Sequence, residues 1–321
     1  MKKLFGVFIF IQIFCWSIGQ QVEQFTIVRE NAIALNPAYA GIKGYMNGVA
    51  TYRKQYSKLT DAPYTAFAEF DMQFQEKNIG LGGMFLHDQT GPTGLTSFTI
   101  AASYHLRLNS HEVLNLDHEW FNNEKTHMIT FGLALSVAQY RLNGDKLNPE
   151  MANDPVIASA PAYQVFPDAS IGVHYQYSNK FFIDFSCPQL LGLNIKYKGA
   201  DRISAIKRVQ HINFMVGGNI KLDNHEKPNY LQPIAALRWA RFSPPQADLG
   251  LRFYARNLVW LGVNYRTVNA VIFEAGVNIK DYVKISYAYD LEISKYRADI
   301  GSTHEIMVGF TLREKLHQRA W

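Results

Sequence analysis

Residues 247–312 read ADLGLRFYARNLVWLGVNYRTVNAVIFEAGVNIKDYVKISYAYDLEISKYRADIGSTHEIMVGFTL, and this stretch decides the fold class. It divides into five short segments in which apolar residues alternate with charged or small ones. In the first segment, for example, Leu249 and Leu251 alternate with Gly250 and Arg252. Successive side chains of a strand point to opposite faces, so each segment has one apolar and one polar face. The stretch therefore predicts five consecutive short strands.

A barrel in a membrane explains this pattern better than a soluble sandwich, whose strands also alternate. Connections such as Arg256-Asn257 and Lys280-Asp281 are very short. The strand lengths are also close to the roughly 9–11 residues that a strand needs to cross a bilayer. The apolar face is aliphatic and aromatic throughout, whereas the other face mixes charged and small residues. This arrangement predicts lipid outside the barrel and a polar lumen inside.

Segments of the same kind occupy most of the chain before residue 247. Together they predict an all-β fold, a transmembrane antiparallel β-barrel of about fourteen strands in the outer membrane, since bacterial single-chain barrels have even strand numbers. If the N-terminus starts in the periplasm, the longer loops lie outside and the shorter turns inside, as is the rule for such barrels. The polar insertion at 109–126 clearly breaks this rule. The predicted outer loops are 58–63, 88–94, 142–167, 187–208, 242–246, 267–269 and 291–303.

The composition agrees with a barrel. The 321 residues are 48% hydrophobic and 14% aromatic, yet the mean hydropathy is only −0.14. A barrel produces this value because about half of its strand residues face a polar lumen. After the N-terminus no stretch of 18 or more apolar residues occurs, so the sequence predicts no transmembrane helix.

The N-terminus has the features of a secretory signal peptide, predicted at 1–19. Lys2 and Lys3 form its positive region, an apolar region follows, and cleavage is expected near Gln20. Cys15 raises a lipoprotein alternative, but Gln12-Ile13-Phe14 before it is not the small-residue box that lipidation requires. Removal of Cys15 with the leader leaves Cys187 alone, which excludes an intramolecular disulfide.

The mature chain is expected to have three parts: a periplasmic lead-in segment at 20–47, the β-barrel at 48–312 and a C-terminal tail at 313–321. We expect the lead-in to pack against the barrel mouth. It contains a distinctive phrase with an Asn-Pro turn, a tyrosine anchor and a turn-forming glycine. The phrase consists of Asn36, Pro37, Ala38, Tyr39, Ala40 and Gly41.

Six basic residues are predicted to share the inward face of the later strands. With Asp248, Glu274 and Asp290 they would either form a salt-bridged, filled lumen or line an anion-attracting channel. The mixed signs favour the filled lumen. The formal net charge of +5 is too small to indicate nucleic-acid binding, and no basic run with interleaved aromatics occurs. The six are Arg238, Arg252, Arg256, Arg266, Lys280 and Lys284.

No pattern in the sequence indicates an enzyme, a cofactor or a metal site. The glycines of 79–83 lie where a strand continues, whereas a phosphate-binding loop opens a helix. The histidines in and beside 109–126 lack the spacing of zinc-protease ligands. His87 and Asp88 would need a marked nucleophile to form a hydrolase site, and Cys187 has no evident base beside it. We therefore expect a non-enzymatic protein.

Several phrases resemble the PorP/SprF family. The phrase at 36–41 and Tyr52-Arg53-Lys54-Gln55-Tyr56 resemble the family's opening. Three later phrases resemble the family's ending: Ser286-Tyr287-Ala288-Tyr289-Asp290, Gly301-Ser302-Thr303-His304-Glu305-Ile306 and Gly309-Phe310. The resemblance implies an outer-membrane barrel of Bacteroidota that works with the type IX secretion system. It also implies partners: outer-membrane lipid, a secreted client protein with a C-terminal sorting domain, and periplasmic components of the secretion or gliding machinery.

These observations lead to one functional hypothesis and one alternative. The hypothesis is a barrel that binds, exports or anchors a large secreted client at the cell surface. Its client face would be formed by the loops at 142–167, 187–208 and 291–303, because loops on a rigid scaffold usually carry binding. The alternative is a general outer-membrane diffusion or solute channel, which the basic lumen residues favour.

Overall fold

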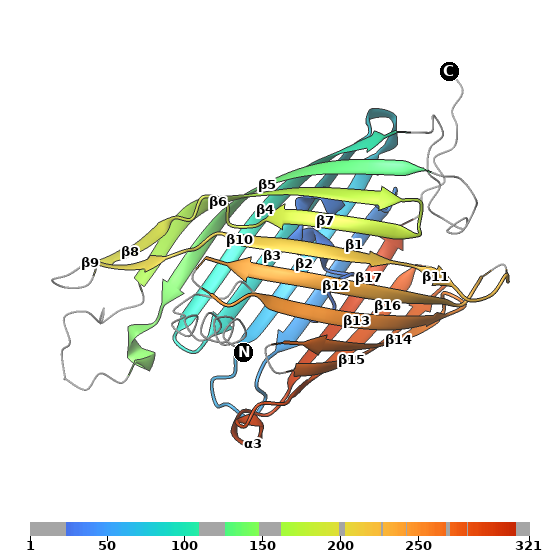
Figure 1. Cartoon of the computed structure of the whole chain (residues 1–321). Helices are drawn as coiled ribbons and strands as arrows, with labels where there is room; N and C mark the ends of the chain where they lie inside the picture. The colour runs from blue at the N-terminus through green and yellow to red at the C-terminus, as the bar shows by residue number, and fades with distance from the viewer. Residues whose placement is uncertain are drawn as a thin grey trace, which may run out of the picture.

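The computed structural model describes residues 24–108, 126–147, 162–198, 203–225, 227–241, 243–267, 270–280 and 282–312, and they form a closed antiparallel barrel (Figure 1). The ring closes where β1 pairs with β17. The short strand β11 continues β10 along the same neighbour, β12, so the wall has 14 strands and the predicted fold is confirmed. The wall strands are β1 (Met46–Lys54), β2 (Tyr64–Phe74), β3 (Ile79–Thr90), β4 (Thr93–Arg107), β5 (His127–Leu142), β6 (Ala162–Tyr177), β7 (Phe181–Cys187), β10 (His211–Gly218), β11 (Ile220–Lys221), β12 (Tyr230–Ala240), β13 (Gln246–Ala255), β14 (Val259–Arg266), β15 (Ala270–Ile279), β16 (Val283–Glu292) and β17 (Thr303–Leu312).

The outer surface of this wall is apolar and its inner surface is polar. On β13, Leu249 and Leu251 are 57% and 45% exposed, whereas Arg252 between Leu251 and Phe253 is 2% exposed. A water-soluble protein would place these side chains the other way round. Exposed apolar side chains of this kind recur around the wall, so the surface matches the hydrocarbon of a bilayer.

The helices of the described residues are short. They are α2 (Ala32–Leu35), α3 (Arg297–Ile300) and the 3₁₀ turns η1 (Pro37–Tyr39), η2 (Gln75–Lys77) and η3 (Gly144–Lys146). None of them is long and apolar enough to cross a membrane.

The two ends of the barrel differ in the length of their connections. At one end, tight turns join β6 to β7, β13 to β14 and β15 to β16, and β1 begins there opposite the last residue of β17. We call this the inner end, because short turns face the periplasm in bacterial barrels. The opposite, outer end carries the long connections, including α3 and a separate hairpin of β8 (Asn194–Lys198) and β9 (Ile203–Lys207) (Figure 1).

Two prolines explain where the strands depart from simple expectation. β6 begins at Ala162, although the proline-rich stretch before residue 168 was expected to be loop. Pro167 is tolerated because β7 stops opposite Ile171, so this part of β6 has a ladder partner on one side only. The interruption between β10 and β11 lies opposite Pro233 of β12, which has no N–H to donate.

The lead-in segment does not pack against the barrel mouth as expected. Its residues from Gln24 onward lie inside the ring of strands, where the blue ribbon crosses the interior in Figure 1. Alternation identifies wall strands but carries no information about a non-periodic segment, so the sequence did not indicate this location. The predicted signal peptide at 1–19, the predicted tail at 313–321 and the insertion at 109–126 (except Thr126) are outside the described residues.

Candidate functional site in the barrel lumen

The lumen is occupied by residues 24–44, which we call the plug. Phe25, Ile33 and Tyr39 of the plug pack against inward-facing Phe67 and Met84 of the wall. Ile27 and Ala38 of the plug are completely buried. Packing of apolar plug residues against apolar wall residues removes both from water and stabilises the seated segment.

A row of small residues crosses five neighbouring strands beneath the plug. Its members are directly paired from one strand to the next: Gly80 on β3, Ser103 on β4, Gly132 on β5, Gly172 on β6 and Ser186 on β7. We call these five residues the small-residue row. Glycine on a strand marks a place where another backbone approaches closely. The row therefore provides a seat for the plug.

The plug uses this seat at contact distance. A Cβ atom at Gly132 would overlap the backbone of Pro37 and Ala38, and one at Gly80 would overlap the Ala40 carbonyl group. Ser103 Oγ donates a hydrogen bond to the same Ala40 oxygen at 2.6 Å. Ser186 Oγ likewise donates to the oxygen of Leu35 at 2.7 Å. The phrase at 36–41 is thus the part of the plug that lies on the small-residue row.

Polar groups of the phrase are also anchored to wall carboxylates. Asn36 Nδ2 donates to Asp184 Oδ1 at 3.3 Å, and the Tyr39 hydroxyl donates to Asp184 Oδ2 at 2.7 Å. The backbone N–H of Gly41 donates to Asp71 Oδ2 at 2.8 Å. Gly41 has a φ of +67°, a conformation that glycine adopts without steric cost. These contacts explain the residue types at Asn36, Tyr39 and Gly41.

Glu30 of the plug belongs to a buried charge cluster. Its carboxylate lies 3.0 Å from Arg252 Nη1 and 3.5 Å from Lys284 Nζ, and Arg252 also pairs with Glu274 at 2.6 Å. Glu30 therefore attaches the plug to β13 and β16.

A second cluster holds the start of the plug. The Glu305 carboxylate, completely buried, accepts hydrogen bonds from the backbone N–H groups of Thr26 and Ile27 at 2.7 and 2.9 Å. The Thr26 hydroxyl bonds to Asp290 at 2.9 Å. Arg53 balances both carboxylates, at 3.2 Å from Asp290 and 3.5 Å from Glu305. A buried charge is tolerated when it is paired and hydrogen-bonded in this way.

Four of the six predicted lumen cations do face the interior. In addition to Arg252 and Lys284, Arg238 lies 3.2 Å and Arg266 3.1 Å from Asp248, within one shared cluster. The structure places the other two, Arg256 and Lys280, in exposed inner turns with positive φ values of 50°. The prediction is wrong for these two residues because β13 ends at Ala255 and β15 at Ile279, where the chain turns.

The sequence did not identify Glu30, Thr26 or the small-residue row as functional. The available signal was the set of glycines at inward-facing strand positions, which weaken a strand unless something approaches them. Read together with the non-periodic segment at 24–44, these glycines would have indicated an internal occupant.

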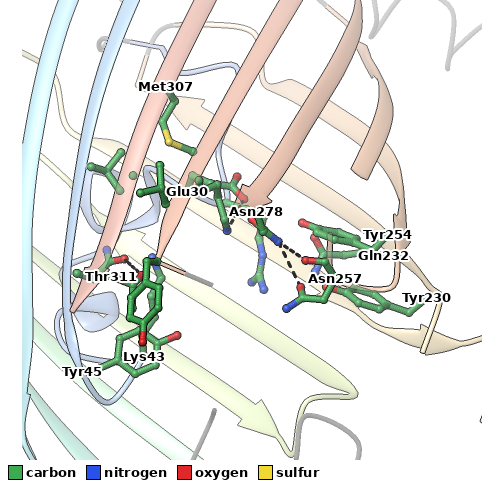
Figure 2. A pocket seen from close by; sticks show the side chains of 17 residues that line it. Glu30, Lys43, Tyr45, Tyr230, Gln232, Tyr254, Asn257, Asn278, Met307 and Thr311 are labelled. Atoms are coloured by element: carbon green, nitrogen blue, oxygen red, sulfur yellow. Dashed lines mark hydrogen bonds and ion pairs between the residues drawn. The ribbon is translucent and has the colours of Figure 1, made fainter. Parts of the chain in front are cut away.

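Polar space remains beside the plug near the inner end. The cavity has a volume of ≈ 150 Å³. Glu30 and Lys43 of the plug line it together with wall residues such as Gln232 and Asn278 (Figure 2). Gln232 Oε1 and Asn278 Oδ1 are buried without a hydrogen-bond partner among the described residues. Water of the kind that fills polar cavities would satisfy them. No group of three or more metal-ligating side chains occurs in the described parts of the chain.

Removal of Arg252 is expected to destabilise the barrel strongly. The variant Arg252→Met leaves Glu30 and Glu274 buried without their main partner, and breaking a buried pair in this way costs about 3–5 kcal/mol. The free energy of unfolding, measured by denaturant titration in lipid vesicles, tests this. Lys146→Met is the matched control, since Lys146 pairs with Asp61 at an exposed site and such pairs contribute about 0–1 kcal/mol. Equal effects of the two variants would contradict the assignment.

Fold and site together define an outer-membrane β-barrel whose lumen is filled by its own N-terminal segment. The chain belongs to the PorP/SprF family: the family described as type IX secretion system membrane protein PorP/SprF matches residues 17–310. The family assignment suggested by the sequence phrases is thereby confirmed, and with it the outer-membrane location.

Solved structures of other proteins are similar to the chain at low sequence identity. The chain is similar to the CymD monoaromatic hydrocarbon channel, with 11% identity, a TM-score of 0.47 and coverage of 90% of this chain and 94% of that one. It is also similar to the translocator domain of autotransporter NalP from Neisseria meningitidis, with 9% identity, a TM-score of 0.40 and coverage of 89% and 93%. At these values the likeness carries no argument. No curated protein matches the chain.

Proposed function

We propose that this protein is a non-enzymatic docking barrel of the type IX secretion system, which binds a large secreted client through its outer loops and holds it at the cell surface. The family membership supports the connection to secretion. The client itself would be a protein with a C-terminal sorting domain, as inferred from the family resemblance.

The observation that carries the proposal is the filled lumen. The plug is attached to the wall by the Glu30 and Glu305 clusters and lies on the small-residue row. A barrel whose lumen is filled by an attached plug is better suited to supporting loops rigidly than to conducting solutes. The alternative, a solute channel, would be favoured by a plug that leaves the lumen readily, and bilayer conductance distinguishes the two.

The long outer connections are the proposed client face. The connection from β7 to β10 carries the β8–β9 hairpin, which pairs with no wall strand. The connection from β16 to β17 carries α3, whose described residues are not buried. Elements of this kind, held by a rigid scaffold, are where binding usually occurs.

Replacement of residues 189–209 by a short Gly-Ser linker is expected to reduce client capture at least about tenfold, which corresponds to about 1.4 kcal/mol of binding energy. The measurement is the amount of sorting-domain protein that co-purifies with the tagged barrel, quantified by mass spectrometry. The control shortens the inner connection at 223–228, at the opposite end. If client capture is unchanged both in the outer replacement and in the control, this loop is not part of the client face.

A further inference from the structure

The plug has a definite direction in the lumen, and it starts near the outer end. Gln24 Nε2 donates a hydrogen bond at 3.0 Å to Gln246, the first residue of β13 at the outer end. Thr26 bonds to Asp290, two residues before the outer end of β16. It also bonds to Glu305, two residues after the outer start of β17.

Two later plug residues contact wall residues near the inner end. Glu30 reaches Lys284, the second residue of β16 counted from its inner start. Gly41 bonds to Asp71, three residues before the inner end of β2. The chain then begins β1 at Met46, which pairs with Leu312, the last residue of β17, at the inner end. In Figure 1 the outer elements α3 and β8–β9 and the inner strand β11 lie at opposite ends of the barrel.

We propose that the chain enters the lumen from the outer end, so that the residues preceding Gln24 emerge on the cell-surface side of the barrel. With cleavage near Gln20, four residues separate the mature N-terminus from Gln24, a reach of at most roughly 14 Å. The N-terminus would then belong to the same outer surface as the long loops. This topology rests on the direction of the plug and on the assignment of the short turns to the periplasmic end, and it goes beyond the proposed docking function.

The outer part of the plug is fixed in this direction by the requirements of buried charges. Glu305 is completely buried, and two of its hydrogen bonds come from the backbone of Thr26 and Ile27. A reversed or withdrawn segment would leave this carboxylate without those donors, and loss of hydrogen bonds to a buried charge is costly. Arg53 pairs with both Asp290 and Glu305, and Arg266 lies 3.5 Å from Asp290 as a second cation.

Cysteine labelling on intact cells tests the proposal. In a Cys187→Ser background, Gln21→Cys reports the N-terminal residues, and Val22→Cys provides a second position. Thr60→Cys in the exposed connection after β1 is the outer control, and Lys77→Cys in η2 is the inner control. Each variant is treated with a membrane-impermeant maleimide before and after permeabilisation of the outer membrane. Mass spectrometry establishes that the leader has been removed.

The expected result is that Gln21→Cys and Val22→Cys react on intact cells to the same extent as Thr60→Cys, whereas Lys77→Cys reacts at least about tenfold more after permeabilisation. The proposal is overturned if the N-terminal cysteines follow Lys77→Cys, or if they stay unlabelled where Thr60→Cys reacts. It is also overturned if Lys77→Cys alone reacts on intact cells, because the outer end would then face the periplasm.

Discussion

Planar bilayers that contain a variant lacking residues 24–44 are expected to conduct at least about tenfold more current than bilayers with the wild-type protein. Side chains just fill the interior of an eight-stranded barrel, whereas barrels of 16–18 strands enclose an aqueous channel. A wall of 14 strands lies between these limits and needs an occupant to remain closed. Without the plug, water and ions would fill the space beside the lumen charges of Arg252 and Glu274.

The matched control for this experiment is the replacement of residues 189–209 by a linker, which shortens the chain by a similar length at the outer end. Its conductance should remain at the wild-type level, because the plug and the small-residue row are unchanged. A wild-type conductance as high as that of the plug deletion would contradict the account. It would instead favour the solute-channel alternative.

Gly132→Leu is expected to displace the plug while the wall remains assembled. The new side chain would occupy the space of the Pro37 and Ala38 backbone, which cannot yield as the end of a flexible side chain can. Extra carbon atoms in a well-packed interior typically cost 1–3 kcal/mol, so plug opening should increase about fivefold or more. Single-channel recordings and the rate of proteolysis within the plug both measure this opening.

Gly83→Leu is the control for the glycine variant. Gly83 lies on β3, and a Cβ at this position would meet nothing within 4 Å. The substitution therefore adds the same side chain to a strand without touching the plug. If both variants open the plug equally, the effect comes from loss of a strand glycine in general, and the small-residue row is not its seat.

The wall of the barrel could be predicted from the sequence because every strand obeys one local rule. Alternation placed Arg252 and Glu274 inside and Leu249 and Leu251 outside, as the structure has them. The rule fails where the chain departs from a regular strand. It placed Arg256 in the lumen although this residue already belongs to a turn.

The plug could not be predicted in the same way, because its position depends on contacts between residues far apart in the chain. Glu30 becomes a site residue only because the folding of β13 and β16 brings Arg252 and Lys284 beside it. Asn36 and Tyr39 were recognised as part of a distinctive phrase, but the sequence did not show that they bind Asp184. The local sequence pattern predicts only a turn at these residues. Their contacts with Asp184 of the wall show that they anchor the plug.

Disulfide trapping of the plug on the wall tests the central claim most directly. Thr51 Oγ1 donates to Asn31 Oδ1 at 2.7 Å across the boundary between β1 and the plug. In a Cys187→Ser background, Asn31→Cys with Thr51→Cys should form a disulfide readily on mild oxidation of the protein in outer membranes. Asn31→Cys with Ala50→Cys is the control pair, because Ala50 is the neighbouring residue on the opposite, exposed face of β1. Cross-linking confined to the first pair is the predicted result. Failure of that pair to cross-link in a folded barrel, or equal cross-linking of both pairs, would show that the N-terminal segment does not occupy the lumen.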